Sequence, residues 1–248
     1  MLKGRLVKPD IKSEGSGAKV KRLFPSSELD HYDPFVLLDE FFVDPEAGFP
    51  RHRHAGFEAV TYMIEGGFRH EDDLGNKASV DTGGVQKFSA GGGIKHSEMP
   101  VGDKQSHGFQ LWINLPHDLK DSEPSYQRVE ADDIPVKHDG KSKIKTIIGK
   151  DSPVNTNNPV LFQDIILEEA CFNSVEFPEE YQGFLYVYEG EISIDNKGDS
   201  IVDVPEGKAY FPSKGRRFSI RCDKSSKMIV ISGKPIGDEI KLRGSIVE

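Results

Sequence analysis

Residues 48–58 read Gly-Phe-Pro-Arg-His-Arg-His-Ala-Gly-Phe-Glu and place two histidines, His52 and His54, two positions apart. Residues 90–98 read Ala-Gly-Gly-Gly-Ile-Lys-His-Ser-Glu and end in a second pair of the same spacing, His96 and Glu98. Side chains two apart on a β-strand point to one face, so each pair can present two ligands to one point. Two such strands facing each other would supply three imidazoles and a carboxylate, a donor set that suits iron, manganese, nickel, copper or zinc. The sequence therefore predicts a metal site built on strands.

Short apolar runs separated by turn residues continue along the chain, which is typical of an all-β fold. Residues 57–64 form one such run, and residues 109–115 alternate between apolar and polar side chains. In the second half we expect strands over residues 160–167, 184–188, 191–194, 208–211, 218–222 and 227–231. A polar, proline-containing stretch over residues 118–139 separates the two halves. The predicted division is into residues 1–135 and 136–248.

The composition excludes some classes of function. The chain has 248 residues and a formal net charge of −9, which argues against binding the phosphate backbone of nucleic acids. Its two cysteines, Cys171 and Cys222, lack a Cys-x-x-Cys pattern and fit a reducing compartment, although a disulfide stays open. Apolar runs fall short of the roughly 18 residues of a membrane span, and the N-terminus lacks the apolar core of a signal peptide. We therefore expect a cytoplasmic protein that binds neither nucleic acid nor membrane.

The two halves resemble diverged copies of each other. Tyr62-Met-Ile-Glu-Gly66 corresponds to Tyr186-Val-Tyr-Glu-Gly190 at an offset of 124 residues. A second match, at an offset of 123 residues, pairs Gly84, Phe88 and Gly92 with Gly207, Phe211 and Gly215. In this register His52, His54, His96 and Glu98 correspond to Glu176, Pro178, Ser219 and Arg221. We therefore expect metal binding in the first half only.

Several ordered motifs resemble those of the cupin superfamily and, more narrowly, the pirin family. The two histidine-containing segments quoted above resemble the two cupin motifs. The pirin-like segments are Asp33-Pro-Phe35, Leu37-Leu-Asp-Glu-Phe41, Phe49-Pro50 through Glu58, His70-Glu-Asp72, Leu74-Gly-Asn76, Ala90-Gly91, His96-Ser-Glu-Met-Pro100 and Gln110-Leu-Trp-Ile-Asn-Leu-Pro116. The specific part of the resemblance covers residues 30–127, with a looser match at Gly233-Lys-Pro-Ile236. Arg, Asp, Trp and Arg are usual in the family where Ala55, Gly84, Lys87 and Gly92 stand, and none of these departures removes a ligand.

The resemblance implies a bicupin, with a metal-binding barrel over residues 1–135 and a degenerate barrel without ligands over residues 136–248. It implies Fe(II) held by His52, His54, His96 and Glu98, while nickel, manganese, copper, cobalt and zinc stay open. Glu58 shares the parity of His52 and His54, and many cupins use a glutamate near this place as a ligand. We take Glu98 as the ligand and expect Glu58 to orient an imidazole or to lie in the cavity.

Some pirins resemble quercetin 2,3-dioxygenase in activity, which implies an enzyme acting on a flavonol-like aromatic substrate. In that scheme the flavonol 3-hydroxyl binds the metal as its anion, Glu98 or Glu58 accepts the proton, and O2 then opens the ring with loss of carbon monoxide. The candidates for the apolar lining are Val60, Tyr62, Ile64, Phe88 and Trp112. The family also contains non-catalytic, metal-dependent partners of transcription factors or metabolic enzymes. A purely structural zinc site is a third alternative.

Overall fold

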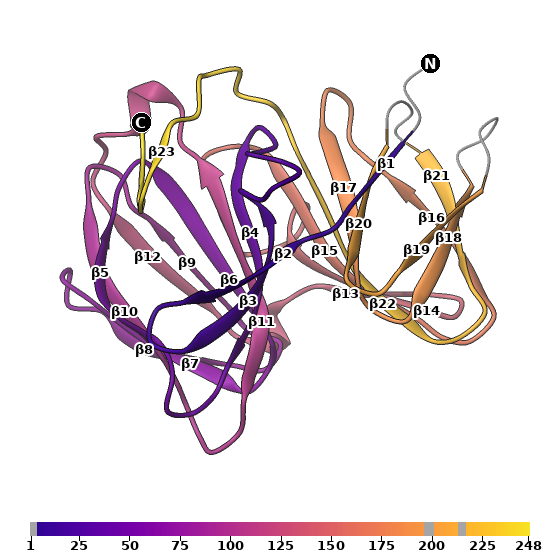
Figure 1. Ribbon diagram of the computed structural model, residues 1–248, viewed down its shortest axis with the longest axis horizontal. Helices are drawn as coiled ribbons and strands as arrows, with labels where there is room; N and C mark the ends of the chain where they lie inside the picture. Colours follow the sequence, from indigo (N-terminus) through magenta and orange to yellow (C-terminus); the bar gives the residue numbers. More distant parts are fainter. Residues whose placement is uncertain (1–3, 196–200, 213–216) are drawn as a thin grey trace. The chain divides into compact units, whose positions relative to one another are not determined.

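The computed structural model describes residues 4–195, 201–212 and 217–248. Within these ranges the regular structure is β-strand, apart from two short 3-10 helices at His117–Leu119 and Ala131–Asp133 (Figure 1). The predicted all-β fold is confirmed, and the strands expected over residues 160–167 and 208–211 have these bounds in the structure. In the part of the chain that is described, no helix has the length and apolar character to cross a membrane.

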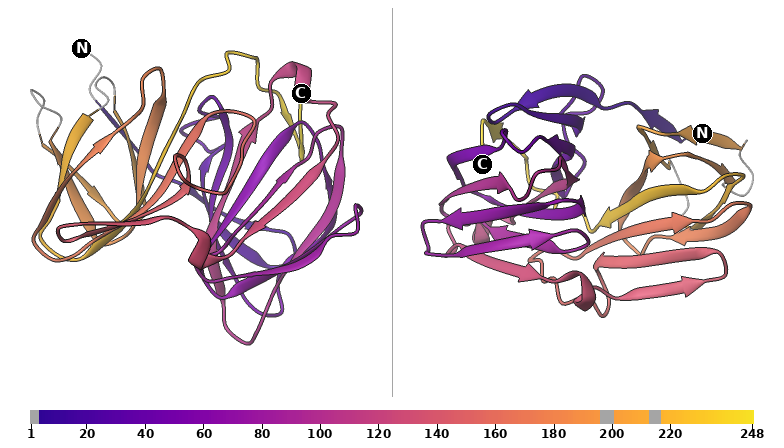
Figure 2. Two further views of the ribbon diagram at one scale, coloured as in Figure 1. Left: turned by 180° about the vertical axis from the view of Figure 1, so that it is seen from behind. Right: turned by 90° about the horizontal axis from the view of Figure 1, so that it is seen from below.

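The chain forms two compact units. The N-terminal unit contains residues 10–134, 153–158 and 236–248, and the C-terminal unit contains residues 135–152 and 159–235 together with the described residues before Asp10. Figure 2 shows the strands of each unit curving around an interior of their own. The main division between Ile134 and Pro135 lies next to the boundary expected after residue 135. The expected division assigned residues 4–9 to the first unit and residues 153–158 and 236–248 to the second. The structure has the reverse assignment for all three segments.

Two antiparallel sheets build the N-terminal unit. A seven-stranded sheet has the order β12–β9–β6–β11–β4–β3–β2, and a four-stranded sheet has the order β5–β10–β7–β8. The strands are β2 (Asp10–Glu14), β3 (Ala18–Phe24), β4 (Phe35–Val43), β5 (Phe49–His54), β6 (Phe57–Glu65), β7 (Gly67–Asp72), β8 (Lys77–Asp81), β9 (Val85–Ser89), β10 (Ile94–Pro100), β11 (Ser106–Asn114) and β12 (Ser125–Val129). A two-stranded hairpin, β23 (Leu242–Arg243) and β24 (Ile246–Val247), completes the unit.

The C-terminal unit repeats this topology. Its seven-stranded sheet has the order β1–β20–β17–β22–β15–β14–β13, and its four-stranded sheet has the order β16–β21–β18–β19. The strands are β1 (Arg5–Val7), β13 (Val136–Asp139), β14 (Ser142–Ile148), β15 (Val160–Leu167), β16 (Cys171–Glu176), β17 (Gln182–Glu189), β18 (Glu191–Asp195), β19 (Val202–Pro205), β20 (Lys208–Phe211), β21 (Arg217–Cys222) and β22 (Ser226–Gly233). The predicted internal repeat is confirmed by this matching strand order, although Gly215 lies outside the described residues.

Strand pairing corrects the register in which the two copies were aligned. Glu98 pairs with His70, the fourth residue of β7, and Ile220 pairs with Ile194, the fourth residue of β18. Ile220 therefore takes the place of Glu98, and Phe218, two residues earlier, takes the place of His96. The offset is 122 residues here, against 124 at Tyr186. The sequence comparison used an offset of 123 residues here, one more than the strand pairing gives. A shift of one residue exchanges the two faces of a strand, so Ser219 and Arg221 were wrongly aligned with the ligands.

The corrected register shows what replaces the ligands. Phe218 pairs with Val175, as His96 pairs with His52. Val175, Ile194, Phe218 and Ile220 are all buried members of one hydrophobic cluster. Where the N-terminal unit gathers imidazoles and a carboxylate, the C-terminal unit therefore has an ordinary apolar core. This agrees with the expectation that only the first copy binds metal.

Each end of the chain belongs to the unit formed mainly by the other half of the sequence. Strand β1 is an edge strand of the C-terminal unit through its pairing with β20, the position that β12 has beside β9 in the N-terminal unit. Residues 236–248 belong to the N-terminal unit, where Ala55 and Ile246 form a parallel bridge. Residues 153–158 also belong to that unit. Local periodicity predicts strands but not their partners, so these assignments were not visible in the sequence.

Candidate metal centre

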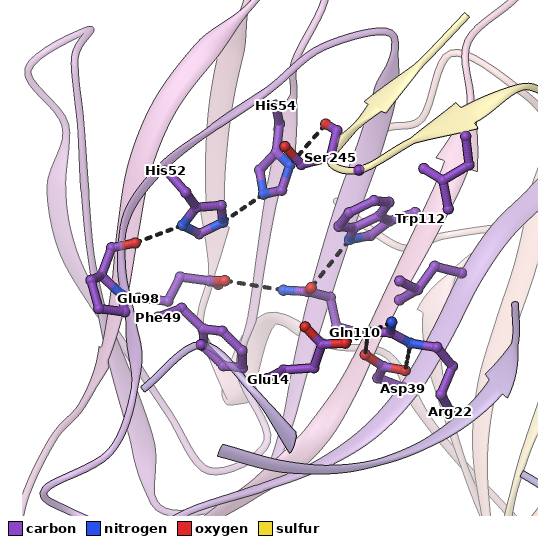
Figure 3. A pocket seen from close by; sticks show the side chains of 15 residues that line it. Glu14, Arg22, Asp39, Phe49, His52, His54, Glu98, Gln110, Trp112 and Ser245 are labelled. Carbon is purple, nitrogen blue, oxygen red and sulfur yellow. Dashed lines mark hydrogen bonds and ion pairs between the residues drawn. The ribbon is translucent and has the colours of Figure 1, made fainter. Parts of the chain in front are cut away.

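Three imidazoles converge on one point of the N-terminal unit. His52 and His54 lie on β5, and His96 lies opposite His52 on β10. The Nε2 atom of His52 is 2.7 Å from that of His54 (Figure 3). It is 3.2 Å from the Nε2 atom of His96. A β-bulge between His96 and Glu98 shifts the pairing with β5 at this point, and bulges re-aim side chains in this way. The spacing of the two pairs thus produces the cluster that the sequence predicted.

The tautomers of two imidazoles follow from their partners. The Nδ1 of His52 lies 2.7 Å from the carbonyl oxygen of Pro50, and the Nδ1 of His54 lies 3.2 Å from that of Ser245. A carbonyl oxygen only accepts, so each Nδ1 carries the hydrogen and donates it. In the neutral form of each ring, Nε2 then carries a lone pair that points toward the shared point. Lone pairs at 2.7 Å repel one another, so this arrangement is suited to surround a cation.

Burial keeps the imidazoles of His54 and His96 neutral. It lowers the pKa of His54 to about 3, with a further contribution from the neighbouring His52, while the hydrogen bond to Ser245 opposes the shift. Burial also lowers the pKa of His96, and the nearby His54, His52 and His70 add to the effect. Both side chains are therefore unprotonated at neutral pH, which is the form that ligates metals.

Glu98 lies beside the imidazoles and is held by three donors. Its Oε1 accepts hydrogen bonds from Thr61 and Gln86, and its Oε2 accepts one at 3.0 Å from Gln110. Trp112 donates to the carbonyl oxygen of the same Gln110 side chain, at 3.1 Å (Figure 3). This chain of bonds fixes which way the Gln110 amide points, because its oxygen faces Trp112 and its nitrogen faces Glu98.

The potential ligands form two overlapping groups. Ligand atoms of His52, His54 and His96 lie within 4.8 Å of one another, and so do those of His70, His96 and Glu98. His96 belongs to both groups, whereas Glu98 is grouped with His96 and His70 and not with His52 and His54. A set of three nitrogens and one carboxylate oxygen fits a divalent transition metal such as iron, nickel or manganese.

His70 supports His96 from behind. Its Nδ1 is 3.4 Å from the Nδ1 of His96, its Nε2 is 3.1 Å from Oδ2 of Asp72, and its ring stacks on Tyr126. A carboxylate behind an imidazole is the usual way in which a ligating histidine is oriented. The structure thus shows His70 in contact with His96 rather than with the shared point of the three imidazoles.

Glu58 lies elsewhere, which corrects one prediction. Its carboxylate accepts hydrogen bonds from Asn157, at 2.8 Å from the backbone nitrogen and 2.9 Å from the side chain, and it pairs with Lys87 at 2.5 Å. It neither orients an imidazole nor enters the cavity beside the cluster. The parity argument failed because β5 ends at His54, and Gly56, with φ of 82°, turns the chain before β6 begins.

A cavity of about 500 Å³ opens beside the cluster. It is lined by His52, His54 and Glu98 on one side, and by apolar side chains that include Leu37, Phe49, Trp112 and Leu242. Trp112 was predicted correctly, and Phe88 packs against His54 and His96. Val60, Tyr62 and Ile64 were predicted wrongly: they have the opposite parity on β6 to Thr61, whose hydroxyl reaches Glu98.

Sequence reasoning missed two parts of the cavity wall. One is the β23–β24 hairpin, from which Leu242, Gly244 and Ser245 contribute. The other is a charged trio, Glu14, Arg22 and Asp39, on strands β2, β3 and β4. Asp39 lies in one of the pirin-like segments quoted above, but that segment did not assign it to a cavity, and Glu14 and Arg22 lie outside those segments. A pattern of inward-pointing charges on three consecutive strands was the one available signal.

Family models match both halves of the chain. Residues 17–113 match the pirin family, and residues 162–248 match the pirin C-terminal cupin domain. The chain belongs to the pirin family. A pirin-like protein from Solanum lycopersicum is 39% identical over 241 residues, which cover 95% of this chain and 82% of that relative. The expected bicupin fold is thereby confirmed.

Solved structures agree with this membership. Quercetin 2,3-dioxygenase from Acinetobacter baumannii is 27% identical with a TM-score of 0.88, and the match covers 99% of this chain and 92% of that one. A bacterial pirin from Escherichia coli, determined in complex with nickel(II), is 20% identical with a TM-score of 0.76, covering 94% and 99% of the two chains. The second likeness is one of fold. The chain is thus a pirin-family bicupin with a cupin-type cluster of histidines and glutamate.

The departures from the usual pirin pattern have structural counterparts. Lys87 forms the ion pair with Glu58. At Gly84 a side chain would meet Val80 at 2.9 Å and the carbonyl oxygen of Asp81 at 3.0 Å, so the backbone here suits glycine. The carbonyl oxygen of Gly92 accepts a hydrogen bond from Arg53, and that of Ala55 accepts one from Val247. These pirin positions therefore shape the scaffold around the site.

Proposed function

We propose that this pirin-family chain binds a divalent metal, with iron preferred, through His52, His54, His96 and Glu98, and oxidises a flavonol such as quercetin. The observation that carries the proposal is the convergence of the Nε2 atoms of His52, His54 and His96 beside a cavity of about 500 Å³. Ligand sites of this size accommodate molecules as large as a flavonol. The likeness to a quercetin 2,3-dioxygenase supports the choice of reaction.

The metal, when bound, supplies Lewis acidity that lowers the pKa of an enolic hydroxyl and leaves positions open for small ligands. The imidazoles are ready for this role, because the hydrogen on Nδ1 of His52 and of His54 is already donated elsewhere. His70 and Asp72 hold His96 in the same way from the far side. Iron is preferred on the family resemblance, and the donor set also suits nickel and manganese.

Glu98 is the group that accepts the proton of the flavonol 3-hydroxyl. Its Oε2 borders the cavity and is bonded to Gln110, while Thr61 and Gln86 hold Oε1. Trp112, Phe49 and Leu37 present apolar surface to a planar ring system beside it. These side chains exclude water and orient the hydroxyl toward Glu98. The overall reaction adds O2 across the heterocyclic ring, which opens with loss of carbon monoxide.

Oxygen uptake tests the proposal. The protein is loaded anaerobically with Fe(II), its metal content is measured, and oxygen consumption is followed with quercetin present. We expect uptake by the wild type and its loss in Glu98→Gln, which removes the proton acceptor. Glu58→Gln is the matched control, because Glu58 is an equally buried carboxylate bound to other partners. This control is expected to retain uptake.

A second variant separates the metal site from the fold. His96→Ala removes the residue common to both ligand groups. We expect metal uptake to fall close to zero while thermal unfolding stays cooperative, since the C-terminal unit has Phe218 at the equivalent place. If metal-loaded wild-type protein consumes no oxygen with quercetin or related enols, the enzymatic proposal fails. The metal-dependent regulator then becomes the leading alternative.

A further inference from the structure

The wall of the cavity formed by β2, β3 and β4 carries two carboxylates on a single guanidinium. Arg22 donates to both oxygens of Asp39, at 2.8 Å and 2.6 Å, and its Nη1 lies 2.8 Å from Oε1 of Glu14. Figure 3 shows these three side chains together, with Gln110 between them and the histidines. Asp39 is buried, whereas about a third of the Glu14 side chain is exposed, at 36%.

The trio has a net negative charge, because one cation faces two anions. Burial would lower the pKa of Arg22, but its bonds to Asp39 and Glu14 outweigh this and raise it. Burial raises the pKa of Asp39, and Arg22 opposes that rise. The charge on Asp39 therefore depends on Arg22 staying bound to it. A ligand carboxylate at this wall would meet two carboxylates beside one guanidinium, so repulsion between like charges opposes its binding.

A ligand that donates hydrogen bonds is favoured at this wall. Arg22 binds Oε1 of Glu14, so the second oxygen of this carboxylate can accept a hydrogen bond from an incoming hydroxyl. Both oxygens of Asp39 also retain accepting capacity, since each carboxylate oxygen can accept two hydrogen bonds. The same cavity is also lined by the apolar side chains of Leu37, Phe49 and Trp112. It thus combines the histidines and Glu98, apolar surface and an acidic wall.

We propose that Glu14 and Asp39, positioned by Arg22, select ligands that carry hydroxyl groups remote from the chelating end and reject ligands that carry a carboxylate there. The selection rests on the proposed function, because it assumes that a flavonol-like molecule occupies the cavity. It adds a prediction of specificity that the metal cluster alone does not make. Polyhydroxylated flavonols bind better than flavonols whose remote rings lack hydroxyls.

Equilibrium binding without turnover tests the selection. The protein is loaded with Ni(II) and titrated anaerobically with quercetin, with 3-hydroxyflavone and with a flavonol carrying a carboxylate on its remote ring. All three share the chelating group. Hydrogen bonds to charged partners contribute enough for quercetin to bind about tenfold more tightly than 3-hydroxyflavone. The carboxylate ligand is expected to bind most weakly.

The variant Glu14→Gln identifies the residue responsible, and it keeps the size of a partly exposed side chain. We expect the preference for quercetin to shrink several-fold, with the affinity for 3-hydroxyflavone unchanged. Asp10→Asn is the matched control, because Asp10 lies on the same strand but bonds to Ser27 outside the cavity. This control is expected to keep the preference.

The outcomes separate the two proposals. If Glu14→Gln keeps the full preference, or if the carboxylate ligand binds best to the wild type, the selection by the acidic wall is overturned while the proposed function stands. If none of the three ligands binds the metal-loaded wild type, the flavonol proposal itself fails, and the selection fails with it. A preference that disappears in Glu14→Gln alone supports both.

Discussion

Glu58 and Glu98 are both buried carboxylates of the N-terminal unit, yet their partners differ in kind. Glu98 is held by neutral donors, Thr61, Gln86 and Gln110, beside the imidazoles. Glu58 pairs with the ammonium of Lys87, whose side chain is 10% exposed. The hydrogen-bond donors around Glu98 thus carry no charge, whereas Glu58 forms an ion pair with an ammonium. The sequence placed both near the site, and only the contacts distinguish them.

Removing the Glu58 carboxylate should therefore affect stability and spare the metal. In Glu58→Ala the ammonium of Lys87 is left buried without its partner, and we expect a loss of about 3–5 kcal/mol in the free energy of unfolding. Urea denaturation measures this loss, and metal analysis of the folded variant should give wild-type stoichiometry. In Glu58→Gln/Lys87→Met both charges are removed, so much of the stability should return. A folded Glu58→Ala protein that has lost its metal would contradict this reading.

At the scale of elements, much of the fold could be predicted from alternation and turn residues. The strand bounds at β15 and β20 and the two ligand pairs on β5 and β10 follow from local patterns. The register between the two copies could not be predicted, because a short connection that differs in length changes the face on which each later residue lies. The sequence also did not predict that β1 pairs with β20 or that β23 and β24 belong to the N-terminal unit. Contacts between residues far apart in the sequence leave no local pattern.

The β23–β24 hairpin should control how firmly the metal is held. Its Ser245 accepts the hydrogen bond from His54, and its Val247 is buried against the same core as Phe57 and Trp112. Deleting residues 242–248 removes the group that orients His54, and such losses typically cost ten- to a hundredfold in metal affinity, roughly. Competition with a chelator measures the change. Ser245→Ala keeps the carbonyl oxygen and should behave as the wild type. Equal affinity in the deletion variant would show that the hairpin has no such role.

The two cysteines should form a disulfide on oxidation. Cys171 and Cys222 are free, buried and directly opposite each other on β16 and β21. Opposite residues have Cβ atoms about 4.5–5.5 Å apart, close to the separation in a disulfide. Diamide should take one hydrogen from each thiol, and mass spectrometry should show this loss in the wild type but not in Cys171→Ser. Burial raises the pKa of the Cys222 thiol, so the reaction should be faster at alkaline pH. An unchanged mass after prolonged treatment would refute the pairing.

At the scale of the whole molecule, one topology was used twice with different interiors. The two sheets of each unit have the same strand order, but imidazoles and a carboxylate stand in one unit where Val175, Phe218 and Ile220 stand in the other. The apolar copy fills its interior, whereas the polar copy buries His54 and His96 and thereby lowers the pKa of both. The free energy of unfolding of the metal-free protein should therefore depend on pH, because these histidines bind protons more readily when the chain is unfolded.

The stability of the metal-free protein should fall as the pH falls below about 6.5. Unfolded histidines take up protons near this pH, whereas the pKa of His54 is lowered to about 3 in the folded state. The unfolded state therefore binds more protons, and the contribution of His54 is progressively lost between about pH 6.5 and pH 3. Urea midpoints measured from pH 8 to pH 5 should decrease, and His54→Gln should flatten the decrease. A midpoint that rises on acidification would contradict the assignment.

The hydrogen bond between His54 and Ser245 joins residues 191 positions apart. During synthesis, β5 and β10 leave the ribosome long before the residues that fix His54 have been translated. Until Ser245 has been translated, the Nδ1 hydrogen of His54 lacks the carbonyl oxygen that it binds in the folded protein. Under the proposed function we therefore expect firm metal binding only after the β23–β24 hairpin has folded against β5, and a chain that stops before Leu242 should release its metal more readily.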